Sequence, residues 1–200
     1  LMNFPILSSL ILLPVIGSLF LLFSKDKNSN TGKYVALFTS FVNFLISLYL
    51  WYQFDPTTSD FQFVEDREWL KGFINYKVGI DGISILFIVL TALITPLCII
   101  SVNNTVKNRL RDFLIAILVM ESLMIGVFCS LDLVVFYLFF EAGLIPMFLI
   151  IGIWGGTRRV YSAFKFFLYT LLGSVLMLIA IISIYWISGT TDITQLYELG

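Results

Sequence analysis

Six apolar stretches, each about 20 residues long, limit the folds open to this sequence. A helix that rises 1.5 Å per residue needs roughly 20 residues to cross the ~30 Å hydrocarbon core of a bilayer. Backbone groups in lipid must be hydrogen-bonded within their own segment, so each stretch predicts a transmembrane helix. We therefore predict an all-α membrane protein, a single transmembrane domain over residues 1–200, with spans Phe4–Phe23, Tyr34–Gln53, Ile83–Val102, Phe113–Leu131, Leu133–Trp154 and Phe166–Ile187.

Composition excludes several classes of protein. Hydrophobic residues make up 59% of the chain and charged residues 12%, too few to cover a soluble domain. The net charge of −1 gives no basic field for nucleic acid. The chain has no histidine, and Cys98 and Cys129 both lie in apolar stretches, where packing is their expected role. We predict no metal site, no cofactor and no catalytic constellation in this chain.

The basic residues predict the orientation of the spans. Nine of the 12 lysines and arginines lie in the connections after the first, third and fifth spans: Lys25, Lys27, Lys33, Lys107, Arg109, Arg111, Arg158, Arg159 and Lys165. Acidic residues gather in the other connections. The positive-inside rule therefore places both termini outside. Nothing basic precedes the first span, so we expect it to remain as a helix rather than to act as a cleaved signal.

The long connection between the second and third spans carries a weaker signal. Apolar and polar residues alternate at Phe61–Val64 and in part at Ile74–Val78, which predicts a short β-hairpin on the outer face. Asp132, between the fourth and fifth spans, is expected to be solvated.

Two carboxyl groups lie in the middle of predicted spans. Glu121 and Glu141 are each more than about 10 Å from both ends of their helices, too far to reach water by extension. A charge at this depth costs roughly 2.5–3.5 kcal/mol on insertion scales. Each acid therefore has two possible roles. It is a structural group, which is either ion-paired or protonated and hydrogen-bonded, or it is a protonatable site on an ion path.

The surroundings of Glu141 favour the second interpretation. Pro146 has no N–H, so the carbonyl of Ala142 loses its helical partner one residue from the acid, and Gly143 thins the helix there. A free carbonyl beside a buried carboxyl is a suitable place for water. Lys165, at the predicted start of the sixth span, is expected to extend its ammonium into the headgroups, or alternatively to provide a cation near the entry of a proton path.

The residues from Glu121 to Leu178 also resemble a known family. The stretch FFEAGLIPMFLIIGIWGG, together with VGIDGIS at Val78–Ser84 and YQFDPTTSDFQFVE at Tyr52–Glu65, closely resembles chain 4 of NADH:ubiquinone oxidoreductase, respiratory complex I. The resemblance covers nearly the whole chain. It implies an antiporter-like subunit that translocates protons in the membrane arm of the respiratory chain, in a mitochondrial inner membrane or a bacterial plasma membrane.

The resemblance also implies roles for particular residues. In the family, the acid matching Glu141 pairs with a lysine on the seventh helix, and the positions of Glu121 and Lys165 match an acid and a lysine of the same proton path. Family members have about fourteen helices in inverted repeats, so the chain corresponds to the first six. The implied partners are other membrane-arm subunits and a chain that supplies the remaining helices. FMN and iron–sulfur clusters are expected in other partner subunits of the complex.

Two other functions fit the residues. A multi-chain cation/proton antiporter or a membrane-bound hydrogenase shares the antiporter-like fold. A purely structural membrane subunit would use its buried acids to pack helices.

Overall fold

The computed structural model describes residues 5–23, 30–70, 74–102, 106 and 108–198. Its six long helices are α1 (Ile6–Phe23), α2 (Asn30–Gln53), α3 (Ser84–Ser101), α4 (Leu110–Cys129), α5 (Leu133–Trp154) and α6 (Arg159–Ser188). All six are long and apolar enough to cross a membrane. The prediction of an all-α membrane fold with six spans is confirmed. A short α7 (Ile193–Glu198) follows α6.

The helix boundaries differ from the predicted ones where charge or a turn intervenes. The fifth span begins and ends as predicted, whereas α6 begins at Arg159, seven residues before the predicted start. A hydropathy window stops at charged residues, but a helix backbone can continue through them. Helix α4 ends at Cys129, two residues before the predicted end at Leu131, because the backbone of Ser130 is extended. The predicted start at Phe4 and the basic residues Lys25, Lys27 and Lys107 lie outside the described residues.

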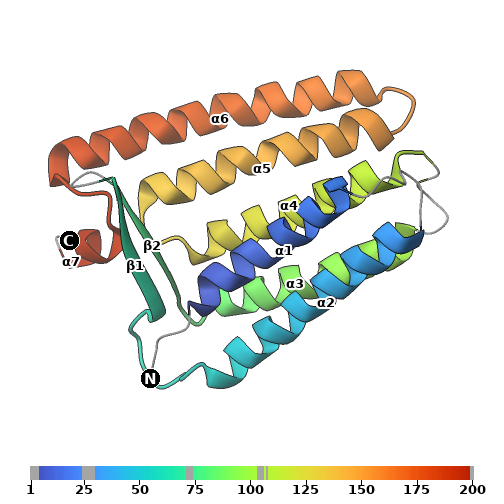
Figure 1. Cartoon of the computed structure of the whole chain (residues 1–200). Helices are drawn as coiled ribbons and strands as arrows, with labels where there is room; N and C mark the ends of the chain where they lie inside the picture. Colours follow the sequence, from blue (N-terminus) through green and yellow to red (C-terminus); the bar gives the residue numbers. More distant parts are fainter. Residues whose placement is uncertain (1–4, 24–29, 71–73, 103–105, 107, 199–200) are drawn as a thin grey trace.

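The predicted hairpin is also confirmed. Strand β1 (Gln62–Leu70) pairs antiparallel with β2 (Ile74–Ile80), and the hairpin lies across one end of the helices (Figure 1). It is joined to α1 by Glu65, whose carboxylate accepts hydrogen bonds from the backbone N–H groups of Leu7, at 2.9 Å, and Ser8. The acid of β1 therefore caps the first turn of α1, where the N–H groups have no helical partner.

The helices form layers that differ in burial. In Figure 1, α5 and α6 lie side by side on one side of α1 and α4, and α2 and α3 lie on the other side. Eight residues of α4 are buried, but only three of α5 and three of α6. The outer faces of α5 and α6 are therefore largely uncovered within the described part of the chain.

Two apolar clusters make up the core. One lies beneath the hairpin and includes Leu10, Leu50, Ile125 and other buried residues of α1 to α4, and the second, toward the basic connections, contains Leu21, Ala36, Ile99, Leu114 and Leu118. Both α2 and α4 contribute to both clusters. Between the two clusters, α2 and α4 each bury one strongly polar side chain. These are Asn43 in α2 and Glu121 in α4.

The start of α1 and the short helix α7 lie at the end of the bundle that carries the hairpin (Figure 1). The described basic residues Arg109, Arg111 and Arg158 lie at the opposite end, in or beside the α3–α4 and α5–α6 connections. We call the hairpin end the outer end and the opposite end the inner end.

Candidate functional site

Glu141 lies in the middle of α5, and the first turn of this helix is capped by a side chain. The helix begins after Asp132, whose Oδ1 accepts hydrogen bonds from the N–H groups of Val134, at 2.8 Å, and Val135, at 3.2 Å. Glu141 is the ninth of the 22 residues of α5, about 12 Å along the helix from Leu133. It is therefore close to the middle of a membrane-spanning helix, as the sequence predicts.

One carboxyl oxygen of Glu141 is buried without a hydrogen-bond partner among the described residues. This oxygen is Oε2, and no ion pair within those residues involves Glu141. A Cβ atom placed on Gly143 would contact nothing within 4 Å, so this part of the helix has open space beside it. Pro146 lies inside the continuous helix and supplies no N–H to the Ala142 carbonyl. The unpaired Oε2 of Glu141 therefore lies one residue from a backbone carbonyl that has no N–H donor at the usual helical position.

Glu121 has a different environment. It is only 2% exposed, and its Oε1 accepts a hydrogen bond from the side-chain amide of Asn43, Nδ2, at 2.9 Å. The next residue, Ser122, donates its hydroxyl to the Ile11 carbonyl at 2.5 Å. These two bonds join α4 to α2 and to α1. Asn43 was not among the predicted site residues, although an amide in the middle of an apolar helix is a signal that could have identified it.

The two acids lie at the same depth in the bundle. Glu121 is eight residues before Cys129 at the end of α4, and Glu141 is eight residues after Leu133 at the start of α5. Because α4 and α5 are antiparallel neighbours joined by a short turn, each acid lies about 12 Å from that turn. Residues twenty apart in the sequence are thus brought to one level.

Lys165 lies near the inner end of α6, but inside the helix. It is the seventh residue of α6 rather than the residue before it, and its side chain is exposed, with Nζ 5.9 Å from the centre of the Tyr161 ring. Phe164, the residue before Lys165 in α6, contacts Phe148 of α5, with ring centres 5.3 Å apart. Lys165 therefore lies at about the level of Phe148. That level is about 10 Å from Glu141 along the helix axis, so the structure does not bring the two together.

A cavity of about 660 Å³ extends from the hairpin to the level of the acids. Its outer part is lined by Ser8, Arg67 and Tyr76, and its deeper part by Ser122 and Ala142, with apolar side chains between them. Ser122 and Ala142 are the sequence neighbours of Glu121 and Glu141. The cavity therefore reaches both helices at the depth where they carry a carboxyl group.

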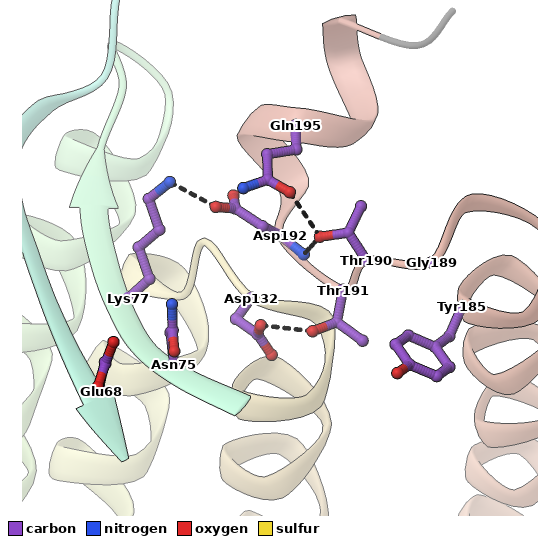
Figure 2. A pocket seen from close by; sticks show the side chains of 10 residues that line it. All are labelled: Glu68, Asn75, Lys77, Asp132, Tyr185, Gly189, Thr190, Thr191, Asp192 and Gln195. Carbon is purple, nitrogen blue, oxygen red and sulfur yellow. Dashed lines mark hydrogen bonds and ion pairs between the residues drawn. The ribbon is translucent and has the colours of Figure 1, made fainter. Parts of the chain in front are cut away.

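A second, smaller cavity of about 230 Å³ lies at the outer end (Figure 2). Here Lys77 of β2 donates to Asp192 Oδ2, at 2.6 Å, and to the Thr194 hydroxyl, at 2.7 Å. The Thr191 hydroxyl donates to Asp132 Oδ2 at 2.6 Å. These bonds connect the hairpin, the α4–α5 turn and the segment after α6.

The prediction that Asp132 is solvated is wrong. The side chain is 3% exposed, because the segment around Thr191 covers it and β2 packs beside the same turn. The pKa of the neighbouring Asp192 reflects the same packing: partial burial raises it, but the hydrogen bonds from Lys77 and Thr194 outweigh burial and hold it below its usual value. Sequence could not place Lys77 beside Asp192, since they are far apart along the chain.

No group of three His, Cys, Asp or Glu side chains that could hold a metal ion occurs within the described ranges.

Comparisons with known proteins agree with this architecture. Residues 7–127 match the family model for the amino terminus of NADH-ubiquinone oxidoreductase chain 4. The chain belongs to this family. Residues 130–199 match a second model, that of the transmembrane region of NADH:quinone oxidoreductases and Mrp antiporters.

Relatives of chain 4 occur in bacteria and plants. Over 171 residues, 86% of this chain, it is 60% identical to NADH-quinone oxidoreductase subunit M of Rhodobacter capsulatus. Over 189 residues, 94% of this chain, it is 49% identical to NADH-ubiquinone oxidoreductase chain 4 of Arabidopsis thaliana. The chain spans only 32% and 38% of the lengths of these two relatives.

Solved structures show the same fold. A chain of respiratory complex I from Thermus thermophilus is similar over 93% of this chain and 38% of that one, with a TM-score of 0.77 and 32% identity. An archaeal membrane-bound sulfane sulfur reductase matches with a TM-score of 0.78 and 20% identity, covering 98% of this chain and 30% of that one, a likeness of fold alone.

Proposed function

We propose that this chain is the N-terminal part of a proton-translocating subunit in the membrane arm of complex I. Its membership of the chain 4 family and its six spanning helices support this role. NADH oxidation and quinone reduction would take place on other subunits, which would hold the FMN and iron–sulfur clusters. This chain would move protons and carry no redox chemistry.

The observation that carries the proposal is the unpaired, buried Oε2 of Glu141 in the middle of a spanning helix. A carboxyl group in this position needs a cation, water or a proton. At an effective dielectric near 20, a cation about 4 Å away would stabilise the carboxylate by roughly 4 kcal/mol. Moving that cation away would make the acid take up a proton. Glu141 can therefore act as a switchable acid that responds to charge movement elsewhere in the complex.

Glu121 and Lys165 are the further members of the proposed path. Glu121 lies at the same depth as Glu141 on the neighbouring helix, and the larger cavity reaches both levels. Lys165 is exposed near the inner end of α6, about 10 Å from the level of Glu141. It would act at the inner mouth of the path and not as the direct partner of Glu141.

The direct partner would come from helices outside this sequence. The chain spans about a third of the Rhodobacter relative, and the faces of α5 and α6 are the least buried in the bundle. Further helices docked against α5 would cover the open space beside Gly143 and could bring a lysine to Glu141. Other membrane-arm subunits would complete the assembly.

We place the inner end, with its basic connections, in the mitochondrial matrix or the bacterial cytoplasm. Both termini and the hairpin would then face the intermembrane space or the periplasm. Relatives in bacteria and in plants are consistent with either membrane.

A subunit of a multi-chain antiporter is the second candidate, because residues 130–199 match a model that includes Mrp antiporters. Co-purification with NADH-oxidising subunits supports complex I, whereas co-purification with a hydrogenase or with antiporter subunits alone contradicts it.

The decisive experiment compares Glu141→Gln and Glu141→Asp in the assembled complex. The Gln variant keeps the shape of the side chain but cannot ionise. We expect it to assemble with all cofactors and to lose most coupled NADH oxidation and proton transport, while the Asp variant retains part of both. If the Gln variant pumps at the normal proton-to-electron ratio, the proposal for Glu141 is wrong. If it fails to assemble, Glu141 has a structural role.

A further inference from the structure

Three buried side-chain oxygens among the described residues have no hydrogen-bond partner, and two of them belong to one pair. They are Asn43 Oδ1, Glu121 Oε2 and Glu141 Oε2. Asn43 and Glu121 are already joined by the bond from Nδ2 to Oε1, at 2.9 Å. Each member of this pair therefore has one atom satisfied and one unsatisfied. Buried polar atoms without partners are rare and costly, so the arrangement calls for an explanation.

Within the described part of the chain, no group donates a hydrogen bond to either oxygen. Asn43 is fully buried and Glu121 is 2% exposed, and they lie between the two apolar clusters of the core. The hydroxyls of Ser40 and Ser47, on the same buried face of α2, donate to backbone carbonyls of their own helix. Ser122 donates to the Ile11 carbonyl. None of the ion pairs within the described ranges involves Glu121.

The protonation state of Glu121 decides whether the pair can be satisfied. An ionised carboxylate only accepts hydrogen bonds, so it would leave Glu121 Oε2 and Asn43 Oδ1 as two acceptors without a donor. It would also leave a negative charge buried without a cation. A protonated carboxyl group has one O–H donor, and the amide oxygen of Asn43 is an acceptor in need of one. One proton therefore meets both needs.

We propose that Glu121 carries a proton on Oε2 and donates it to Asn43 Oδ1, so that the two side chains form a closed, neutral amide–acid pair between α2 and α4. The terminal torsions of Asn and Glu side chains are broad, so the groups can align without leaving their rotamers. Asn43 is then the positioning residue for this acid. It holds the neutral form of Glu121 in one orientation.

The pair also regulates the proposed path, and this part rests on the proposed function. A proton that is donated to Asn43 cannot pass to water or to another acid until the pair opens. Opening requires α2 and α4 to shift relative to each other, or Asn43 to turn away. Release of the Glu121 proton would thus depend on a change of helix packing, while Glu141 would respond to a nearby charge.

The experiment uses four variants of the assembled complex. In Glu121→Gln, the side-chain amide supplies a carbonyl acceptor and an N–H donor in the places of the neutral acid, so we expect wild-type levels of assembly. Glu121→Leu and Asn43→Leu each leave one partner unmatched, and we expect several-fold less assembled complex. The double variant Asn43→Leu/Glu121→Leu removes both partners, and we expect it to recover part of the loss.

A spectroscopic measurement separates a positioning role from simple packing. The wild-type complex should show an infrared carbonyl band of a protonated carboxyl group that is absent from Glu121→Gln and shifted in Asn43→Leu. A carboxylate band in place of the protonated one would overturn the pair. Failure of Glu121→Gln to assemble, or double-variant losses that simply add, would overturn it as well.

Proton transport tests the proposed function separately. If Glu121→Gln assembles and loses transport, both the pair and the path are supported. If it assembles and transports protons normally, the pair stands and the role of Glu121 in the path is wrong.

Discussion

Replacing Asp132 with alanine should lower the free energy of unfolding, because the side chain caps the start of α5. The side chain caps the helix through Val134 and Val135, and loss of such a cap costs about 1 kcal/mol. The Thr191 hydroxyl, in a residue that is 7% exposed, would also lose its acceptor, at a cost of about 1–3 kcal/mol. The expected destabilisation is therefore about 2–4 kcal/mol, at least roughly a thirtyfold change in the unfolding equilibrium.

Equilibrium unfolding of the chain in lipid–detergent bicelles with added SDS, followed by tryptophan fluorescence, measures this change. Asp132→Asn should cost clearly less than Asp132→Ala, about 1 kcal/mol or less, because asparagine is an equally good cap. Its Nδ2 would lie where Asp132 Oδ2 accepts from Thr191, and it could donate to the Thr191 hydroxyl oxygen instead. Asp60→Ala, at an exposed acid in the outer connection, is the matched control with an expected effect below about 0.5 kcal/mol. If Asp132→Ala is no more costly than Asp60→Ala, the proposed role of Asp132 in holding α5 is wrong.

Two further predictions rest on contacts in the structure, and a third rests on the distribution of basic residues. Gly126→Ala would place its Cβ 2.5 Å from the Phe139 ring, so it should destabilise the α4–α5 contact by about 1–3 kcal/mol in the same assay, whereas Gly173→Ala, which meets open space, should not. The pKa of Asp192 is lowered, so its pair with Lys77 stabilises the fold above the usual aspartate pKa and is lost as the pH falls through the lowered value. Asp192→Asn should therefore unfold at a temperature that depends less on acid pH, and an unchanged pH dependence would contradict this. In intact membranes, an impermeant thiol reagent added from outside should label Thr58→Cys but not Arg109→Cys, and the reverse result would invert the proposed orientation.

Much of the fold was predictable because the bilayer restricts what a chain can do. Lipid offers no hydrogen bonds to the backbone, so an apolar stretch of sufficient length must be helical, and the fifth span was predicted to the residue. The hairpin was predictable from alternating residues in the outer connection. Such features depend only on local sequence and on the solvent around it.

The acids were also visible in the sequence, because a carboxyl group in an apolar stretch is costly wherever it points. Their partners were not. Asn43 lies 78 residues from Glu121, and Lys77 lies 115 residues from Asp192, so only the packing of the helices and of the outer segments could bring each pair together. Periodicity places a residue on a face of a helix but does not say which helix covers that face.

The sequence by itself therefore determined the number of spans, their relative direction and the depth of each buried acid, since these follow from hydropathy and helical rise. The tertiary structure alone decided that Glu121 is enclosed and paired, that Glu141 keeps a buried oxygen without a partner among the described residues, and that Asp132 is buried under the segment after α6. The physical reason is that a hydrogen bond needs a partner within about 3 Å, and such proximity is a property of the packed chain.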